Sequence, residues 1–506
     1  MSYCSLGVGA LVACMGFLLQ PGSGLAQGAS LEQRLRELES AYTELLVRDG
    51  EKTKELERLQ GEVSALRQGK RDAGAAAAHG RDRGPDRGHD HGKAEKAPAA
   101  KDAGHDHGHA DAHGHADDPV HDHAAQDSSD VLLESGGFRV YVPSVGLDLV
   151  GYRDDSSQDL EARLGTLRGF GHAHGGEEEH EHAQLKDGFN LRHAELGFAA
   201  EAIGFGRAQV LINAGEDGVE LEEAFVQSDP IAGIAALKAG KFRSAFGYFN
   251  QYHSPEWKFA DAPLAHFLLF GDHGLEGTGV QAVLTPPGLP VSVGLEVFQG
   301  GGETIFSRND AAGKIEEPSV YVGWVKGKVV EQGPNRLDVG FAGGFGRHQE
   351  VHAEEGEEEK LKGDVWFLSP GFTFFRRGGG PFGAGDVTIK GEYVYRAKDL
   401  ANVDNGEPVD SMQDGYYLEA AYGFAPRFEA GLRWEQAGLI NETTEGDSTE
   451  DFGRSWRAGG FFAFHPVRWT RVGVQANYGS YDFEDGRAEV FQALGRVVFQ
   501  FGPHFH

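Results

Sequence analysis

The run Val490-Phe491-Gln492-Ala493-Leu494-Gly495-Arg496-Val497-Val498-Phe499-Gln500-Phe501 decides the fold. Successive side chains of a strand point to opposite faces. One face of this run would carry Phe491, Ala493, Gly495, Val497, Phe499 and Phe501, and the other Gln492, Arg496 and Gln500. An apolar face suits lipid and a polar face suits a wet lumen, so the run predicts a strand of a membrane β-barrel.

Similar runs recur along the chain and predict sixteen strands. They fall at 139–152, 189–200, 206–213, 219–227, 236–243, 277–285, 290–299, 319–328, 336–345, 364–375, 386–396, 415–424, 427–434, 455–464, 468–479 and 489–501. The expected long connections are 153–188, 244–276, 300–318, 346–363, 397–414 and 435–454.

Long and short connections alternate almost throughout, which is typical of a barrel with short periplasmic turns and longer external loops. The predicted fold class is therefore all-β, a transmembrane antiparallel β-barrel of about 16 strands over residues 138–506. An even number of strands places both ends of the barrel on the periplasmic side. Outer-membrane lipid is then the partner of its exterior.

Composition and motifs narrow the function classes. The formal net charge of −31 disfavours nucleic acid as a partner and favours cations or an acidic, soluble surface. No segment after the N-terminus has 18 consecutive apolar residues, which excludes a helical membrane protein. The chain has no Gly-x-Ser-x-Gly, phosphate-loop or His-Glu-x-x-His motif, so we expect no enzyme and no required cofactor.

The N-terminus predicts export. An apolar stretch from Leu6 to Leu19 precedes small residues that end at Ala26, which is typical of a signal peptide over 1–26. The residues before Cys14 also resemble a lipobox, which leaves lipid attachment as an alternative. Both cysteines, Cys4 and Cys14, lie in this segment, so the mature chain would have no thiol chemistry.

Residues 31–68 predict a periplasmic coiled coil. Nine apolar residues between Leu31 and Leu66 share one heptad register, and so narrow an apolar seam favours oligomerisation. A single amphipathic helix that packs on the barrel is the alternative. Residues 69–130 follow as a His-rich linker of Ala, Gly, Asp and His, which we expect to be disordered because it cannot bury enough apolar surface to fold.

Histidines are dense in the linker and in the first long loop. Imidazole is a good ligand for zinc and other divalent transition metals, so the pattern predicts metal binding. The predicted ligands are His89, His91, His105, His107, His109, His113, His115, His121, His123, His172, His174, His180 and His182. A hydrophilic spacer is the alternative. A further acidic loop, 348–359, would give the pore mouth a negative potential.

The segment 241–275 is too apolar and aromatic for a loop in water. A loop folded into the lumen as a pore constriction would explain this composition, and a lid or a subunit contact is the alternative. The residues predicted to line the constriction and set selectivity are Arg243, His253, Glu256, Lys258, Asp261, His266, Asp272 and His273.

The signal, the coiled coil, the strand count and Gly240-Lys241-Phe242-Arg243 before a long folded loop together resemble the phosphate-selective porin family. The resemblance implies a trimeric channel with a periplasmic N-terminal extension. The basic ladders expected of an anion channel are not evident, and the loops are acidic. The loops rich in His and acidic residues also resemble those of zinc-regulated outer-membrane proteins.

These observations favour an outer-membrane porin, homotrimeric through coil and barrel, that lets small solutes or ions diffuse passively. Passage of zinc or another transition metal is an added expectation. One alternative is a zinc-regulated, energised metal receptor, a class that needs about 22 strands and a plug. The other alternative is an envelope tether built from the coil and the linker.

Overall fold

The computed structural model describes residues 131–156, 160–170, 185–215, 218–300, 304–309, 312–354 and 357–502. The predicted signal peptide, coiled coil and linker lie outside these residues. All thirteen histidines predicted to bind metal, His89 to His182, also lie outside them. The described residues fall within one compact unit, His107–His506.

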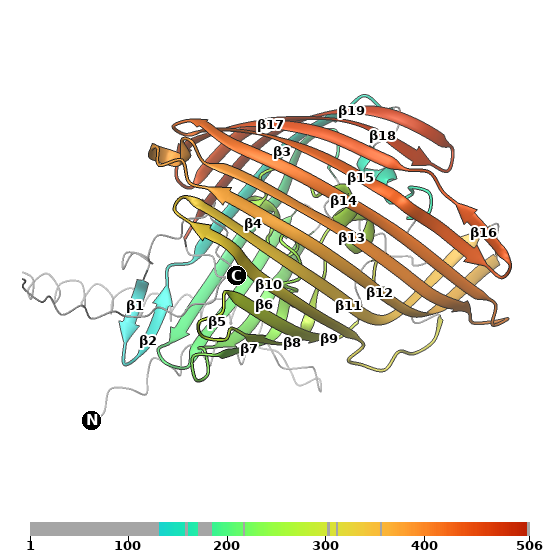
Figure 1. The fold of residues 1–506 in the computed structure, drawn as a ribbon, viewed down its shortest axis with the longest axis horizontal. Coiled ribbons are helices and arrows are strands. Elements are labelled where there is room, and N and C mark those ends of the chain that lie inside the picture. Colours follow the sequence, from blue (N-terminus) through green and yellow to red (C-terminus); the bar gives the residue numbers. More distant parts are fainter. Residues whose placement is uncertain are drawn as a thin grey trace, which may run out of the picture. The chain divides into compact units, whose positions relative to one another are not determined.

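The unit is a closed barrel of 16 antiparallel strands (Figure 1). They are β3 (Ser144–Asp154), β4 (Gly188–Ala202), β5 (Gly206–Gly215), β6 (Gly218–Ser228), β7 (Ala235–Arg243), β8 (Glu276–Leu284), β9 (Val291–Phe298), β10 (Val320–Gln332), β11 (Asn335–Glu354), β12 (Glu357–Arg376), β13 (Val387–Asn402), β14 (Pro408–Ala425), β15 (Phe428–Glu445), β17 (Ser455–Val467), β18 (Thr470–Phe483) and β19 (Gly486–Phe501). Each strand pairs with the next, and β19 pairs with β3 to close the barrel, with Gly495 opposite Gly151.

Smaller elements complete the described part of the chain. The hairpin β1 (Val131–Ser135) and β2 (Phe138–Tyr141) extends the sheet beside β4, and β16 (Ser448–Asp451) extends it beside β15. The helices are α3 (Leu160–Leu164), α4 (Leu264–Phe270) and two 3-10 turns, Ser254–Glu256 and Pro381–Gly383. None of the described helices has the length and apolar character needed to cross a membrane.

Apolar side chains face outward and polar side chains face inward, which is the reverse of a water-soluble barrel. Leu432 is 72% exposed, whereas its neighbour Arg433 is 3% exposed and points inward. The last strand shows the predicted alternation, with Phe491 and Val497 exposed and Arg496 buried. An apolar exterior around a polar interior requires an apolar solvent, which makes the exterior a lipid-facing surface.

The predicted number of strands is confirmed, but three predicted loops are wrong. The strands extend into segments 346–363, 397–414 and 435–454 and form most of their described residues, and the β11–β12 ladder reaches Glu354 opposite Glu357. Main-chain hydrogen bonds hold these strands together whatever the polarity of the side chains. The described residues of the acidic segment thus belong to the paired ends of β11 and β12, and His348 is buried there, 2.9 Å from Glu350.

The first predicted strand, 139–152, is also wrong as a single element. It is divided into β2 and β3 at Val142 and Pro143. Proline has no backbone N–H to donate to a ladder, so a strand interior tolerates it poorly.

Candidate channel constriction

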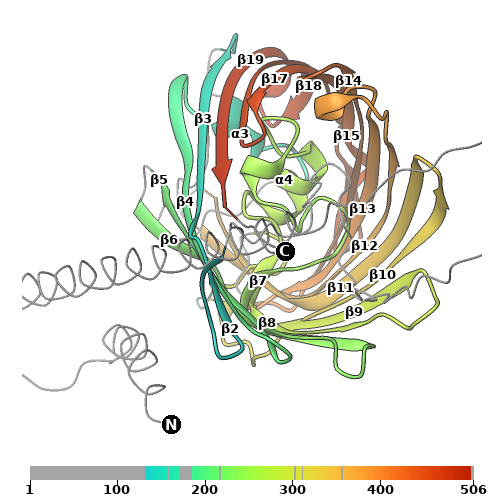
Figure 2. The ribbon, with the colours of Figure 1, turned by 90° about the vertical axis from the view of Figure 1, so that its left-hand side faces the viewer.

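The loop 244–275, between β7 and β8, lies within the ring of strands. Figure 2 shows its helix α4 inside the barrel. The loop buries Phe246, Phe259, Leu268 and Phe270. These side chains pack against the inner wall and against each other, which explains why so apolar a segment need not be a surface loop.

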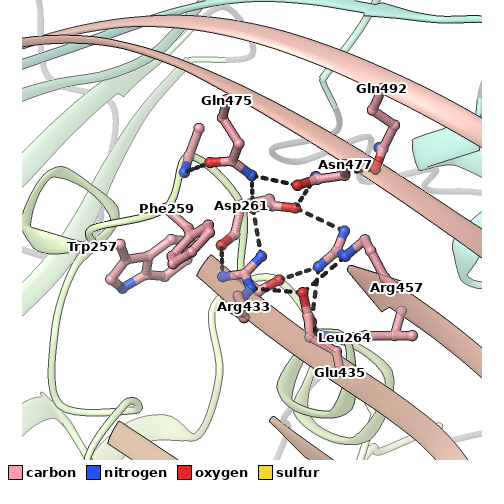
Figure 3. Close-up of polar contacts among 12 residues, drawn as sticks. Trp257, Phe259, Asp261, Leu264, Arg433, Glu435, Arg457, Gln475, Asn477 and Gln492 are labelled. Atoms are coloured by element: carbon pink, nitrogen blue, oxygen red, sulfur yellow. Dashed lines mark hydrogen bonds and ion pairs between the residues drawn. The ribbon is translucent and has the colours of Figure 1, made fainter. Parts of the chain in front are cut away.

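Asp261 is the central anchor of this loop (Figure 3). Arg433 of β15 and Arg457 of β17 approach its two carboxylate oxygens at 2.6 and 2.8 Å. Gln475 and Asn477 of β18 donate to the same oxygens at 2.6 and 2.9 Å. Four donors from three strands therefore satisfy one buried carboxylate, which ties the loop to the opposite wall.

Glu435 links this anchor to α4. Its carboxylate accepts hydrogen bonds from Arg433 at 2.6 Å and from Arg457 at 3.0 Å. It also accepts one from the backbone N–H of Leu264, the first residue of α4. The two arginines are thus balanced by the two carboxylates of Asp261 and Glu435, which a buried charge cluster requires.

A second set of arginines holds the backbone of the loop. Arg496 of β19 forms an ion pair with Asp148 at 2.8 Å and donates to the carbonyls of Trp257 at 2.8 Å and Phe259 at 3.0 Å. Arg192 of β4 pairs with the same Asp148 at 2.6 Å and donates to a further loop carbonyl. These hydrogen bonds satisfy backbone carbonyls of the loop that lie outside any helix or strand.

Glu392 of β13 fastens both ends of the loop. It lies 2.6 Å from Nε2 of His266 in α4 and accepts a hydrogen bond from the backbone N–H of Tyr248. Gly247 permits this approach because its φ is +61° and an added Cβ would lie 2.8 Å from the Glu392 carboxylate.

A group of inward-facing arginines, here called the arginine wall, lines part of the barrel. No basic ladder was evident from the sequence, and the structure corrects the prediction on this point. Inward-facing arginines occupy four neighbouring strands and β4; they are Arg192, Arg496, Arg471, Arg457 and Arg433. Each lies in a different strand, and only the strand order brings the five together. The sequence signal that could have revealed these arginines is a charged residue next to an apolar one within a strand, as in Leu432-Arg433.

The structure divides the eight residues predicted for the constriction into anchors and lining residues. Asp261 and His266 are buried anchors of the loop. Glu256 accepts a hydrogen bond from the backbone N–H of His253 at 3.2 Å, and Lys258 pairs with Glu429 of β15. Glu256 and Lys258 also line a pocket between the loop and the wall, together with Phe249, Tyr252, Trp257, Phe259, Thr388, Lys390, Glu419 and Arg433.

Of the remaining four residues, one ends β7 and three lie elsewhere on the loop. Arg243 ends β7, with its Nε 3.8 Å from Glu276, and His253 is buried against β6. Asp272 and His273 are partly exposed after α4. The structure therefore buries four of the eight residues, Arg243, His253, Asp261 and His266, and the role of all eight in selectivity stays a prediction.

The pKa of Asp261 yields a test of the anchor. Burial alone would raise this pKa, but Arg433 and Arg457 lower it to about 2. A carboxyl group with a lowered pKa stabilises the fold above its unfolded value and loses that effect as the pH falls through the folded value. The stability difference between the native protein and Asp261→Asn should stay constant above about pH 5 and shrink towards pH 2, measured by urea unfolding. A difference that does not change down to about pH 2 would contradict the assignment.

No known family model matches this chain. An uncharacterised protein of Aquifex aeolicus is 26% identical over 389 residues, which cover 72% of this chain and 80% of that protein.

Among solved structures, the outer membrane channel DcaP of Acinetobacter baumannii has a TM-score of 0.45 and 14% identity over 73% of this chain and 99% of that chain. OmpT of Vibrio cholerae, an outer membrane protein, has a TM-score of 0.45 and 11% identity over 74% and 100%. An anion-selective porin from Comamonas acidovorans has a TM-score of 0.42 and 12% identity over 72% and 100%. Similarities this low do not establish a function, so the function has to be argued from the site.

Proposed function

We propose that this protein is an outer-membrane channel through which small solutes diffuse passively, with the loop 244–275 as its constriction. The observation that carries the proposal is the loop itself. It lies inside a closed barrel with a lipid-facing exterior. Buried ion pairs of Asp261 and hydrogen bonds from Arg496 to loop carbonyls tie it to the wall. So many fixed contacts suit a permanent narrowing of a lumen rather than a mobile lid.

Charges of both signs beside the loop would set selectivity. Lys258 and Lys390 face Glu256 and Glu419 around the pocket, so a passing solute would meet cations and carboxylates together. The arginine wall is already engaged by loop carbonyls and carboxylates. Because these arginines are already engaged, we infer a general or cation-preferring channel rather than one dedicated to anions. The more specific proposal is that zinc is among the cations that pass.

The sidedness follows from the connections. The start of β3 and the end of β19 lie at the end of the barrel with short turns such as 203–205 and 468–469. We assign that end to the periplasm, where a coiled coil over 31–68 would join three copies into a homotrimer. A barrel of 16 strands counts against an energised receptor, which needs about 22.

The purified full-length protein should give stable conductance steps in planar lipid bilayers, with current proportional to voltage. The physical reason is a permanent lumen narrowed by a fixed loop. Reversal potentials in a potassium chloride gradient give the selectivity, and the same measurement in zinc chloride tests metal passage. Folded protein that produces no steps would refute the channel, and a strong anion preference would refute the proposed selectivity.

A further inference from the structure

Four side chains with metal-ligating atoms meet where the loop 244–275 contacts β4 and β6. They are His193 and Glu195 of β4, Glu222 of β6 and His253 of the loop, and at most 8% of any of these residues is exposed. Each offers one nitrogen or oxygen atom, and the four atoms lie within 4.8 Å of one another. None of these four residues belongs to the Asp261 anchor, and none is among the thirteen histidines predicted to bind metal.

Two β-bulges direct these side chains inward. One leaves Arg192 as an extra residue in the β3–β4 ladder, so Arg192 and His193 both point into the barrel. The other leaves Glu222 as an extra residue in the β5–β6 ladder, so Glu222 and Glu223 are both buried. A regular strand would turn one residue of each pair towards lipid. Bulges that re-aim side chains are typical of the surroundings of functional sites.

The contacts within the cluster suit a metal better than hydrogen bonding. The carboxylate of Glu222 lies 2.6 Å from Nε2 of His193 and 3.3 Å from Nδ1 of His253. Outside these contacts within the cluster, neither oxygen of Glu222 nor Nε2 of His193 has a hydrogen-bond partner among the described residues. Polar atoms buried in this way are costly, and a cation between them would remove the cost.

The orientation of His193 supports the same reading. Its Nδ1 lies 3.3 Å from the hydroxyl of Ser254, which leaves Nε2 facing Glu222. Metal-binding histidines usually use the second ring nitrogen for such an outer hydrogen bond, which holds the ring in place. Two imidazoles and two carboxylates also match the ligand types and the number that zinc prefers.

We propose that His193, Glu195, Glu222 and His253 bind one divalent transition-metal ion, with zinc as the best match. The bound ion would fasten the loop 244–275 to β4 and β6, whereas Asp261 fastens it to β15, β17 and β18. The charges balance, because two carboxylates neutralise a divalent cation and both imidazoles bind it in their neutral form.

A proton on His253 is the competing occupant. Burial alone would lower the pKa of this histidine, but the carboxylates of Glu222 and Glu223 raise it to about 9. A protonated His253 would form ion pairs with these carboxylates and leave no place for a metal. The experiment must therefore distinguish a bound ion from a bound proton.

Metal content of the full-length protein in detergent tests the proposal. Samples are loaded with zinc, equilibrated with a chelator of intermediate strength, and analysed by mass spectrometry. We expect Glu222→Gln and His253→Asn each to bind one zinc per chain less than the native protein. His273→Asn, a change of the same kind in the same loop, is the matched control and should retain it. All variants carry the same His-rich segments, so the difference reports on the cluster alone.

Two further measurements keep the test decisive if Glu222→Gln fails to fold. His253→Asn leaves every strand unchanged, and its folding is checked by heat-modifiable migration in gels. Cobalt in place of zinc should give the intense absorption of a four-coordinate site in the native protein and lose it in His253→Asn. Equal zinc content in the native protein and both folded variants would overturn the proposal and favour the proton. Because metal content is measured without conductance, this outcome is independent of the channel proposal.

Discussion

Replacement of Asp261 by Asn is expected to detach the loop 244–275 and to increase the single-channel conductance. The native carboxylate lies 2.6 Å from Arg433 and 2.8 Å from Arg457, and all three side chains are buried. Removal of one partner from a buried ion-pair cluster typically costs about 3 to 5 kcal/mol because the remaining charges are left uncompensated. The loop that carries α4 should then move away from the wall. The lumen should widen, and the current should become noisier.

The same substitution should shift selectivity towards anions. It removes one negative charge and leaves two arginines in the lumen with one carboxylate, Glu435, between them. Conductance and reversal potential in planar bilayers measure both effects. Asp404→Asn removes the same charge from an exposed position between β13 and β14 and should change both far less. Native values for Asp261→Asn would show that the loop does not limit the current.

Replacement of Leu432 by Arg should strongly destabilise the barrel in lipid. Leu432 is 72% exposed on β15, five positions from the turn at 426–427. A strand rises about 3.3 Å per residue and tilts in a barrel, so this position should lie near the middle of the bilayer. A charged residue there costs about 2 to 4 kcal/mol, measured by urea-dependent folding into lipid vesicles.

Leu289 provides the matched control. It is also an exposed leucine, at 61%, but it lies in the turn between β8 and β9. Arginine near the membrane interface costs only about 0 to 1 kcal/mol. If Leu432→Arg and Leu289→Arg were equally stable, the apolar exterior could not be the surface that contacts lipid.

The strands were predictable because their signal is local. The alternation in 490–501 can be read from neighbouring residues, and the observed exposure of Phe491 and burial of Arg496 match it. The strand ends were not predictable in the same way. Beyond the lipid, both faces meet water, so alternation disappears although the main-chain ladder continues, as in β11 and β12.

The site was only half predictable. The unusual apolarity of 244–275 marked the loop, and Asp261 was among its predicted residues. Its partners on the wall were not marked, because Arg433, Arg457, Gln475 and Asn477 are ordinary inward positions of three separate strands. Their importance depends on which residues face the loop across the lumen.

The sequence by itself determined a barrel of sixteen strands, its lipid-facing side and the loop that does not belong in water. Periodicity and composition carry these properties, and both are local. Only the tertiary structure decided what that loop contacts. Closure of β19 onto β3 places Asp148 beside Arg496, and the bulges place His193 beside Glu222. Such contacts between distant segments arise from register and closure, which no single stretch of sequence records.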